Sequence, residues 1–295
     1  PKENLKSDMH KGFDASITWT DHINDFNYSI GGNITYSRFW DWEQYKPRFS
    51  NSWDEYRNSI WHRVGYVNWG YEAIGRFQNW EQIANYPIDN DRKGNRTVVP
   101  GDIMYKDQNN DGVINYLDER PIGYRVDSTP TLNFGINLSA SWKGFDLAMD
   151  WTGSGMTSWN QCYETARPFQ NDGNSPDEVL KDAWHLSDIW DANSPLIPGK
   201  YPMIRLNTDE TSAYDKSSYW LHNVTYLKLR NLEVGYTFPK TWLNKTGISN
   251  LRLFVSGTNL LTLSNLSVMD PECASDNGLD YPPMRVINIG VNLKF

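Results

Sequence analysis

The sequence predicts an all-β fold, a partial arc of a transmembrane antiparallel β-barrel with long extracellular loops. Several segments alternate apolar and polar side chains, which is the period of a β-strand. The connections between these segments alternate between short and long, as they do in outer-membrane barrels. The chain also contains 14 Trp, 17 Tyr and 11 Phe, the residue types that form the aromatic girdles of such barrels.

Seven strands are expected, over residues 13–19, 26–40, 131–142, 145–151, 232–238, 251–255 and 287–295. In the first, Phe13, Ile17 and Trp19 share one face with Ala15. Arg38 is the one charged residue on the apolar face of the second predicted strand, 26–40. The opposite faces carry Ser, Thr, Asn and Gly, which suits a hydrated lumen better than a protein core. The alternation slips between residues 226 and 230, which predicts a β-bulge or a different strand boundary.

The connections sort by length onto two sides of the predicted sheet. Those at 20–25, 143–144 and 239–249 are short, whereas those at 43–130, 155–217 and 263–284 are long. Outer-membrane barrels have short periplasmic turns and long external loops, so Phe295 is expected near the periplasmic boundary. Seven strands leave two unpaired edges, which are costly in lipid. The remaining strands are therefore expected upstream in the same protein.

Composition and motifs exclude several classes of protein. The net charge of −8, from 28 basic and 36 acidic residues, argues against nucleic-acid binding. No run of 18 apolar residues is present, which excludes a transmembrane helix. The N-terminus has no apolar stretch, so either a signal peptide was removed or the chain begins partway through a longer protein.

No catalytic residue is predicted. The five histidines lack metal-binding spacing, and no nucleophile or phosphate-binding motif occurs, so the chain is not expected to be an enzyme. A secreted glycoside hydrolase is an alternative that would need two loop carboxylates at catalytic separation. Its candidates are Asp188 and Asp191, or Asp209 and Glu210.

The segment 107–118 has the spacing of a twelve-residue calcium loop. Gly112 permits the sharp turn that such a loop requires. The last position holds Asp118 instead of the usual Glu, whose longer side chain binds in a bidentate manner, so weaker binding or a contracted loop is expected. An Asx-rich turn without an ion is the alternative. The predicted Ca²⁺, with a structural role in the loop 43–130, would be held by Asp107, Asn109, Asp111, the carbonyl of Val113, Asn115 and Asp118.

Three further features belong to the long connections. Ser175 as N-cap and Pro176 at the first helical position predict a short helix continuing through 179–184. Cys162 and Cys273 form no disulfide framework, although a single bridge between loops is an alternative. Eight tryptophans in or beside these loops indicate loop packing or an interfacial girdle, and collectively they suggest an amphipathic ligand: Trp53, Trp61, Trp69, Trp80, Trp159, Trp184, Trp190 and Trp220.

Several segments together resemble the SusC/RagA family of TonB-dependent outer-membrane transporters. One is the Asp270-Pro271-Glu272 tripeptide. Another is Tyr-Leu-Lys-Leu-Arg-Asn-Leu-Glu-Val-Gly-Tyr at 226–236. The others, in matching order and spacing, are 101–118, 121–123, 143–147, 257–261 and 281–282.

The resemblance implies that residues 1–295 are the C-terminal part of a barrel of about 22 strands in the outer membrane of a Gram-negative cell. It implies a plug domain and the contact with TonB in upstream sequence, and a SusD-like lipoprotein partner that captures glycans or peptides. Dimers of such transporter–lipoprotein pairs are expected. The chain would then be part of an active importer of oligosaccharides or peptides. The alternative is a secreted, calcium-stabilised β-sandwich that binds carbohydrate, in which a second sheet would bury the apolar faces.

Overall fold

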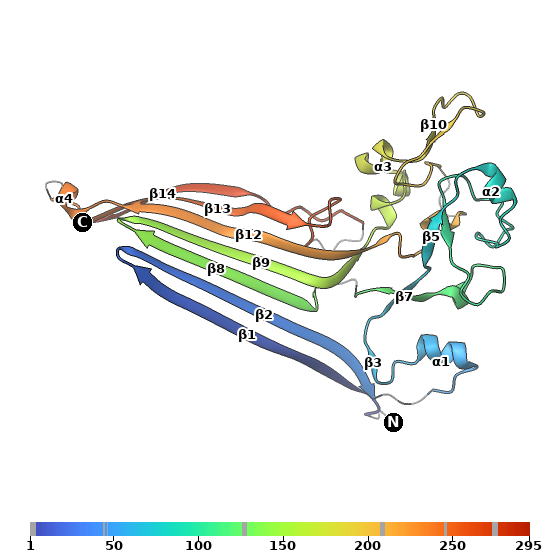
Figure 1. Cartoon of the computed structure of the whole chain (residues 1–295), viewed down its shortest axis with the longest axis horizontal. Coiled ribbons are helices and arrows are strands. Elements are labelled where there is room, and N and C mark those ends of the chain that lie inside the picture. Colours follow the sequence, from blue (N-terminus) through green and yellow to red (C-terminus); the bar gives the residue numbers. More distant parts are fainter. Residues whose placement is uncertain are drawn as a thin grey trace.

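One large antiparallel sheet forms most of the chain, and the long connections gather at one end of it (Figure 1). The computed structural model describes residues 4–295 except 44, 46, 126–128, 207–209, 245–246 and 273–276. The sheet has the order β1-β2-β8-β9-β12-β13-β14, with β3 (Arg63–Val64) added to β2. The seven long strands confirm the predicted fold class: β1 (Ser7–Ile23), β2 (Phe26–Glu43), β8 (Leu132–Trp142), β9 (Phe145–Asn160), β12 (Leu221–Thr237), β13 (Asn250–Ser264) and β14 (Val286–Lys294).

Strands β1, β2, β9, β12 and β13 are longer than the alternation indicated, and the first turn is shorter. Ile23 pairs with Phe26, so the turn predicted over 20–25 consists only of residues 24 and 25. Asn24 adopts a φ of 53°, which a two-residue hairpin turn requires. The turn at 143–144 is confirmed. The predicted bulge is also confirmed, because the register of β12 against both neighbours shifts between Leu229 and Asn231.

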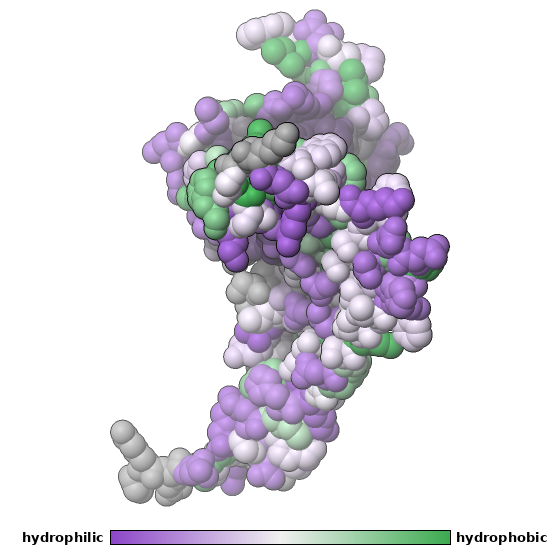
Figure 2. Space-filling model, turned by 90° about the vertical axis from the view of Figure 1, so that its left-hand side faces the viewer, coloured by the Kyte–Doolittle hydropathy of each residue, from purple (hydrophilic) through white to green (hydrophobic). Residues whose placement is uncertain are grey.

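The sheet is an open, curved arc and not a closed barrel. Within the described residues, β1 and β14 are its two edges and do not pair with each other. Seen from the end that carries the short turns, the chain has a crescent-shaped outline (Figure 2). This is the shape expected of one part of a barrel wall.

The apolar face of the sheet is the face that carries Ile17 on β1 and Ile289 on β14. Ile17 is 77% exposed and Ile289 is 83% exposed, and no second sheet of the described chain covers them. A β-sandwich would bury these side chains, so the structure of the described chain argues against that alternative. The opposite, polar face carries residues such as Thr18 and Asn33.

The largest buried core of the described chain lies in the loop region, and a smaller one involves Trp159 of β9 and Tyr226 of β12. Tyr105, Tyr201 and Trp220 are fully buried in the larger core, and Trp220 Nε1 donates to the carbonyl of Ala213 at 2.8 Å. Short elements surround this core: α1 (Ser52–Asn58), β4 (Asn68–Gly70), β5 (Ala73–Arg76), α2 (Trp80–Ala84), β6 (Ile103–Tyr105), η1 (Tyr116–Asp118), β7 (Arg120–Gly123), η2 (Tyr163–Thr165), η3 (Gln170–Asp172), α3 (Asp177–Lys181), β10 (His185–Leu186), β11 (Leu196–Ile197) and η4 (Ser212–Tyr214).

The helices are short and differ in part from the expectation. α3 ends at Lys181 and has Pro176 at its N-cap, so the predicted continuation to residue 184 and the cap by Ser175 are wrong. The helix stops because the next residues join the core, where the amide of Trp184 donates to the carbonyl of Tyr201. α4 (Lys240–Leu243) lies in the short connection before β13. No described helix has the length and apolar character needed to cross a bilayer.

Candidate functional site

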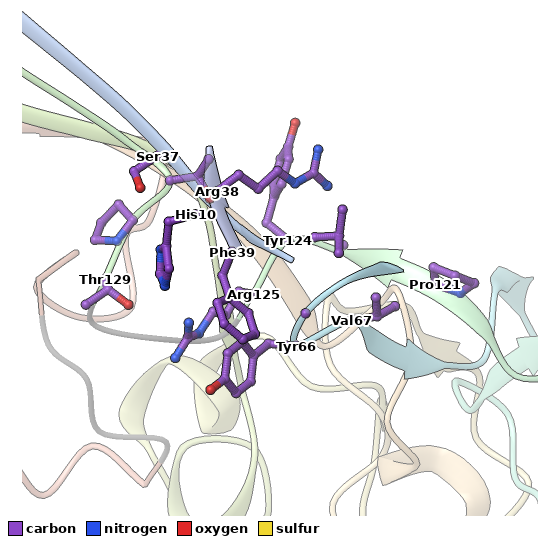
Figure 3. A pocket seen from close by; sticks show the side chains of 15 residues that line it. His10, Ser37, Arg38, Phe39, Tyr66, Val67, Pro121, Tyr124, Arg125 and Thr129 are labelled. Carbon is purple, nitrogen blue, oxygen red and sulfur yellow. The ribbon is translucent and has the colours of Figure 1, made fainter. Parts of the chain in front are cut away.

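A cavity of about 500 Å³ lies where the sheet meets the loop region (Figure 3). His10 on β1 and Phe39 on β2 are cross-strand partners on the polar face and form one side of it. Tyr66, which follows β3, and Arg125, which follows β7, come from the loop 43–130. Arg38 points away from His10 and Phe39, as the alternation of a strand requires.

The aromatic side chains of the cavity form a continuous series of tilted ring contacts. The ring centroids of His10 and Phe39 are 5.1 Å apart, and those of Phe39 and Tyr66 are 5.2 Å apart. The guanidinium carbon of Arg125 lies 3.7 Å from the centroid of the Tyr66 ring. At Gly65 a Cβ atom would lie 2.2 Å from Phe39, so only glycine permits this packing. The cavity can therefore accept a planar or amphipathic group against these rings.

A charged cluster fastens the connection between β13 and β14 to the sheet. Lys228 of β12 is 1% exposed, and its Nζ lies 2.6 Å and 2.7 Å from the two carboxylate oxygens of Asp270 and 2.9 Å from Glu272. Arg230 forms a second ion pair with Glu272. The structure thus joins two segments that carry the resemblance, 226–236 and 270–272. The buried ammonium holds residues 266–272 against the polar face.

The calcium-type loop is folded as a series of Asx turns. The carboxylate of Asp107 accepts the amides of Asn110 at 2.7 Å and Gly112 at 2.8 Å. Gly112 has a φ of 85°, as the predicted sharp turn requires. Asp118 is fully buried and accepts the amides of Gln108 and Asn115, each at 2.8 Å. Asp107 and Asp118 therefore have structural partners within the loop.

Asp111 is the exposed carboxylate of this loop. Its Oδ2 accepts the side-chain amides of Asn109 at 2.9 Å and Asn115 at 3.4 Å, and Asn115 Nδ2 also donates to the carbonyl of Val113 at 3.1 Å. A cation beside Asp111 would require both amides to turn so that their oxygens face it. In the described residues, no group of three or more His, Cys, Asp or Glu side chains has a metal-binding arrangement. The donor set is oxygen-rich, as Ca²⁺ prefers, but Asp111 Oδ2 would have to give up both amide contacts to bind the ion.

One buried carboxylate in the loop region has a perturbed pKa. Burial raises the pKa of Asp102 to about 6, although the neighbouring Arg205 and the amide of Val99 act in the opposite direction. Arg205 also donates to the carbonyl of Thr97 at 3.0 Å. This pair lies beside the aromatic core and links the loop 43–130 to the loop 155–217.

Among the described residues, the other candidate carboxylates show turn contacts and not a catalytic arrangement. Asp188 and Asp191 each accept a backbone amide two residues further along the chain, which is a turn interaction. Asp209, the partner proposed for Glu210, lies outside the described residues. Cys273 does too, so its pairing with Cys162 stays a prediction.

Most of the loop tryptophans pack against protein. Trp159, Trp184 and Trp220 are buried, whereas Trp190 is 90% exposed. The aromatic cavity is not evident from the sequence. Its residues are distant in sequence, and the only available signal was the alternation that places His10 on the polar face.

No family model matches the chain. It is 30% identical over 243 residues to the TonB-dependent receptor P3 of Formosa agariphila, a match that covers 76% of this chain and 22% of that receptor. The chain belongs to the TonB-dependent receptors. It is also 24% identical over 252 residues to the TonB-dependent receptor SusC of Bacteroides thetaiotaomicron, covering 79% of this chain and 20% of SusC.

Solved structures show the same fold for this receptor segment. A chain in the structure of the RagAB peptide transporter aligns with a TM-score of 0.64 and 21% identity, covering 99% of this chain and 29% of that chain. The RagAB peptide importer in its open-open state aligns equally well, with 22% identity. The segment spans about a fifth of the length of the curated relatives it matches. Membership of this receptor family confirms that the chain is not an enzyme.

Proposed function

We propose that the chain forms part of the wall and external loops of a TonB-dependent importer in the outer membrane of a Gram-negative cell. The observation that carries the proposal is the exposed apolar face of the sheet in a member of this receptor family. Residues 1–295 would be the C-terminal part of the barrel, with the loop 43–130 outside the cell. The remaining strands, the plug and the contact with TonB would lie in the rest of the protein.

On the apolar face, two charged residues mark the ends of an uncharged band. The height of this band matches the thickness of the apolar layer of an outer membrane. Asp21 and Lys11 both lie on this face of β1, ten residues apart. That separation is roughly 33 Å along the strand. At a strand tilt of about 40° it becomes about 25 Å along the membrane normal, which matches the apolar band of outer-membrane barrels. Ile17 lies near the middle of this band.

Two adjacent substitutions in the intact receptor test the membrane location. Ile17→Arg places a charge at the bilayer midplane, where it should destabilise the barrel by about 2–4 kcal/mol. Thr18→Arg places the same charge on the polar face and should have little effect on assembly. The measurement is the amount of folded, heat-modifiable receptor in the outer membrane. Equal tolerance of the two variants would refute the lipid-facing assignment.

The transported molecule is proposed to be an oligosaccharide or a peptide, delivered with a SusD-like surface lipoprotein, in dimers of transporter–lipoprotein pairs. One relative is named SusC and a structural neighbour is a peptide importer. The aromatic rings of the cavity suit sugar rings and amphipathic peptide side chains alike. Tyr66→Ala should lower uptake of the natural substrate without lowering co-purification of the lipoprotein. Unchanged uptake would remove the cavity from the transport path.

Calcium is proposed as a structural ion of the segment 107–118. The support is the spacing of the oxygen donors and the exposure of Asp111. Removing calcium with EDTA should speed proteolysis of the loop 43–130 while the strands remain protected. Asp111→Asn should abolish the difference made by EDTA. Absence of anomalous scattering between Asp107 and Asp111 in crystals grown with calcium would refute the site.

A further inference from the structure

Two cations face each other on the apolar face at its outer boundary. Lys11 and Arg38 are cross-strand partners, one residue pair beyond the stacked rings of Phe13 and Tyr36. Like charges placed directly opposite each other destabilise a strand pair. In the part of the chain that the structure describes, no ion pair joins either cation to a carboxylate. The described part of this chain therefore supplies no counter-charge to the pair.

Tryptophan side chains lie beside both cations of this pair. Lys11 Nζ lies 5.5 Å from the ring centroid of Trp40 and 5.1 Å from that of Trp42. The guanidinium carbon of Arg38 lies 6.0 Å from the Trp40 ring. Lys11 is exposed and Arg38 is half-buried. Tryptophan and basic side chains together are typical of the level of the lipid headgroups.

An apolar depression lies below the cations on the same face. Its volume is about 350 Å³, and Gly32 is at its centre because the two residues paired with Gly32 are Ile17 and Ile136. Ala15 and Phe134 also line it. Gly32 is six residues from Arg38, roughly 20 Å along the strand and about 15 Å along the membrane normal. That distance is half the hydrocarbon thickness, the depth reached by the acyl chains of one leaflet.

We propose that this surface is a binding site for a lipid with a phosphate-bearing headgroup in the outer leaflet, with the phosphate between Lys11 and Arg38 and an acyl chain in the depression at Gly32. The phosphate supplies the missing negative charge, and Arg38 can bind it through two parallel hydrogen bonds. The acyl chain fills a concavity that the protein itself leaves empty. The proposal rests on the membrane location given above.

The test uses the intact receptor, purified in mild detergent and titrated with phosphatidylglycerol while native mass spectrometry counts the retained lipids. The double variant K11Q/R38Q removes the headgroup contact. Each basic residue near an anionic lipid contributes about fivefold to binding, so a loss of roughly 25-fold is expected. The charge-conserving K11R/R38K variant should bind nearly as well as the original receptor, which separates loss of charge from misfolding.

A second variant tests the acyl chain separately. At Gly32 a Cβ atom would have no neighbour closer than 3.9 Å, so G32I should fill the depression without strain. It should weaken binding by about fivefold. K143N is the matched control, because Lys143 lies 5.4 Å from the ring centroid of Trp142 at the opposite boundary and should not affect the site.

Three results would overturn the inference. Equal retention of phosphatidylcholine would show a general annular layer without headgroup recognition. Binding of inorganic phosphate at the affinity of the lipid, insensitive to G32I, would show an anion site without a lipid. Unchanged phosphatidylglycerol binding by K11Q/R38Q would show that Lys11 and Arg38 bind neither a lipid headgroup nor a free anion. Failure of the receptor to partition into lipid nanodiscs is a different result, because it would refute the proposed membrane location itself.

Discussion

Replacing Lys228 with methionine should release residues 266–272 from the sheet. The substitution keeps the length of the buried side chain but leaves Asp270 without its cation, while Glu272 retains only Arg230. Removing one partner of a buried ion pair costs about 3–5 kcal/mol. Asp270 and Glu272 each keep 20% side-chain exposure, so water recovers part of that cost. A local loss of about 2–3 kcal/mol is therefore expected, equivalent to exchange about 30–150 times faster.

Hydrogen–deuterium exchange of the amides in 266–272 measures this loss directly. Arg252→Gln is the control, because Arg252 also bridges two carboxylates, Asp146 and Glu233, on the polar face. Those carboxylates are 35% and 38% exposed, so the control should change stability by less than about 1 kcal/mol. The reasoning is refuted if Lys228→Met leaves exchange in 266–272 unchanged, or if Arg252→Gln accelerates it equally.

Two further predictions concern the loop region. Because burial raises the pKa of Asp102 to about 6, above its unfolded value of 3.8, the folded state binds more protons between these values. The free energy of unfolding of the loop region should therefore fall by about 3 kcal/mol as the pH rises from 4 to above 6. Asp102→Asn should flatten this pH dependence. Urea titrations followed by tryptophan fluorescence measure it. Asp118→Ala should destabilise the segment 107–118 by about 1–3 kcal/mol per lost hydrogen-bond partner, with or without calcium. Asp111→Ala should lower the stability of this segment only when calcium is present. Protease protection of the segment distinguishes the two variants.

The sheet was predictable from sequence because alternation along a strand is a local property. The apolar face, the bulge before Asn231 and the turn at 143–144 all follow from neighbouring residues. The aromatic cavity was not predictable, because His10 and Arg125 meet only after three segments have been placed. The predicted helix end at residue 184 was wrong for a related reason: α3 ends at Lys181, because Trp184 joins a core built from distant residues.

The buried core of the external region limits how its loops can be exchanged. Tyr105 comes from one long connection, whereas Tyr201 and Trp220 come from another, and strands β8 and β9 separate the two in sequence. Tyr105 Oη donates to the carbonyl of Ser212 at 2.7 Å across that boundary. If only one of these connections were grafted onto a related receptor, the graft would lack the buried side chains that the other connection contributes to the core. New ligand specificities would therefore have to be transplanted as pairs of connections, and related receptors should vary in these two regions in concert.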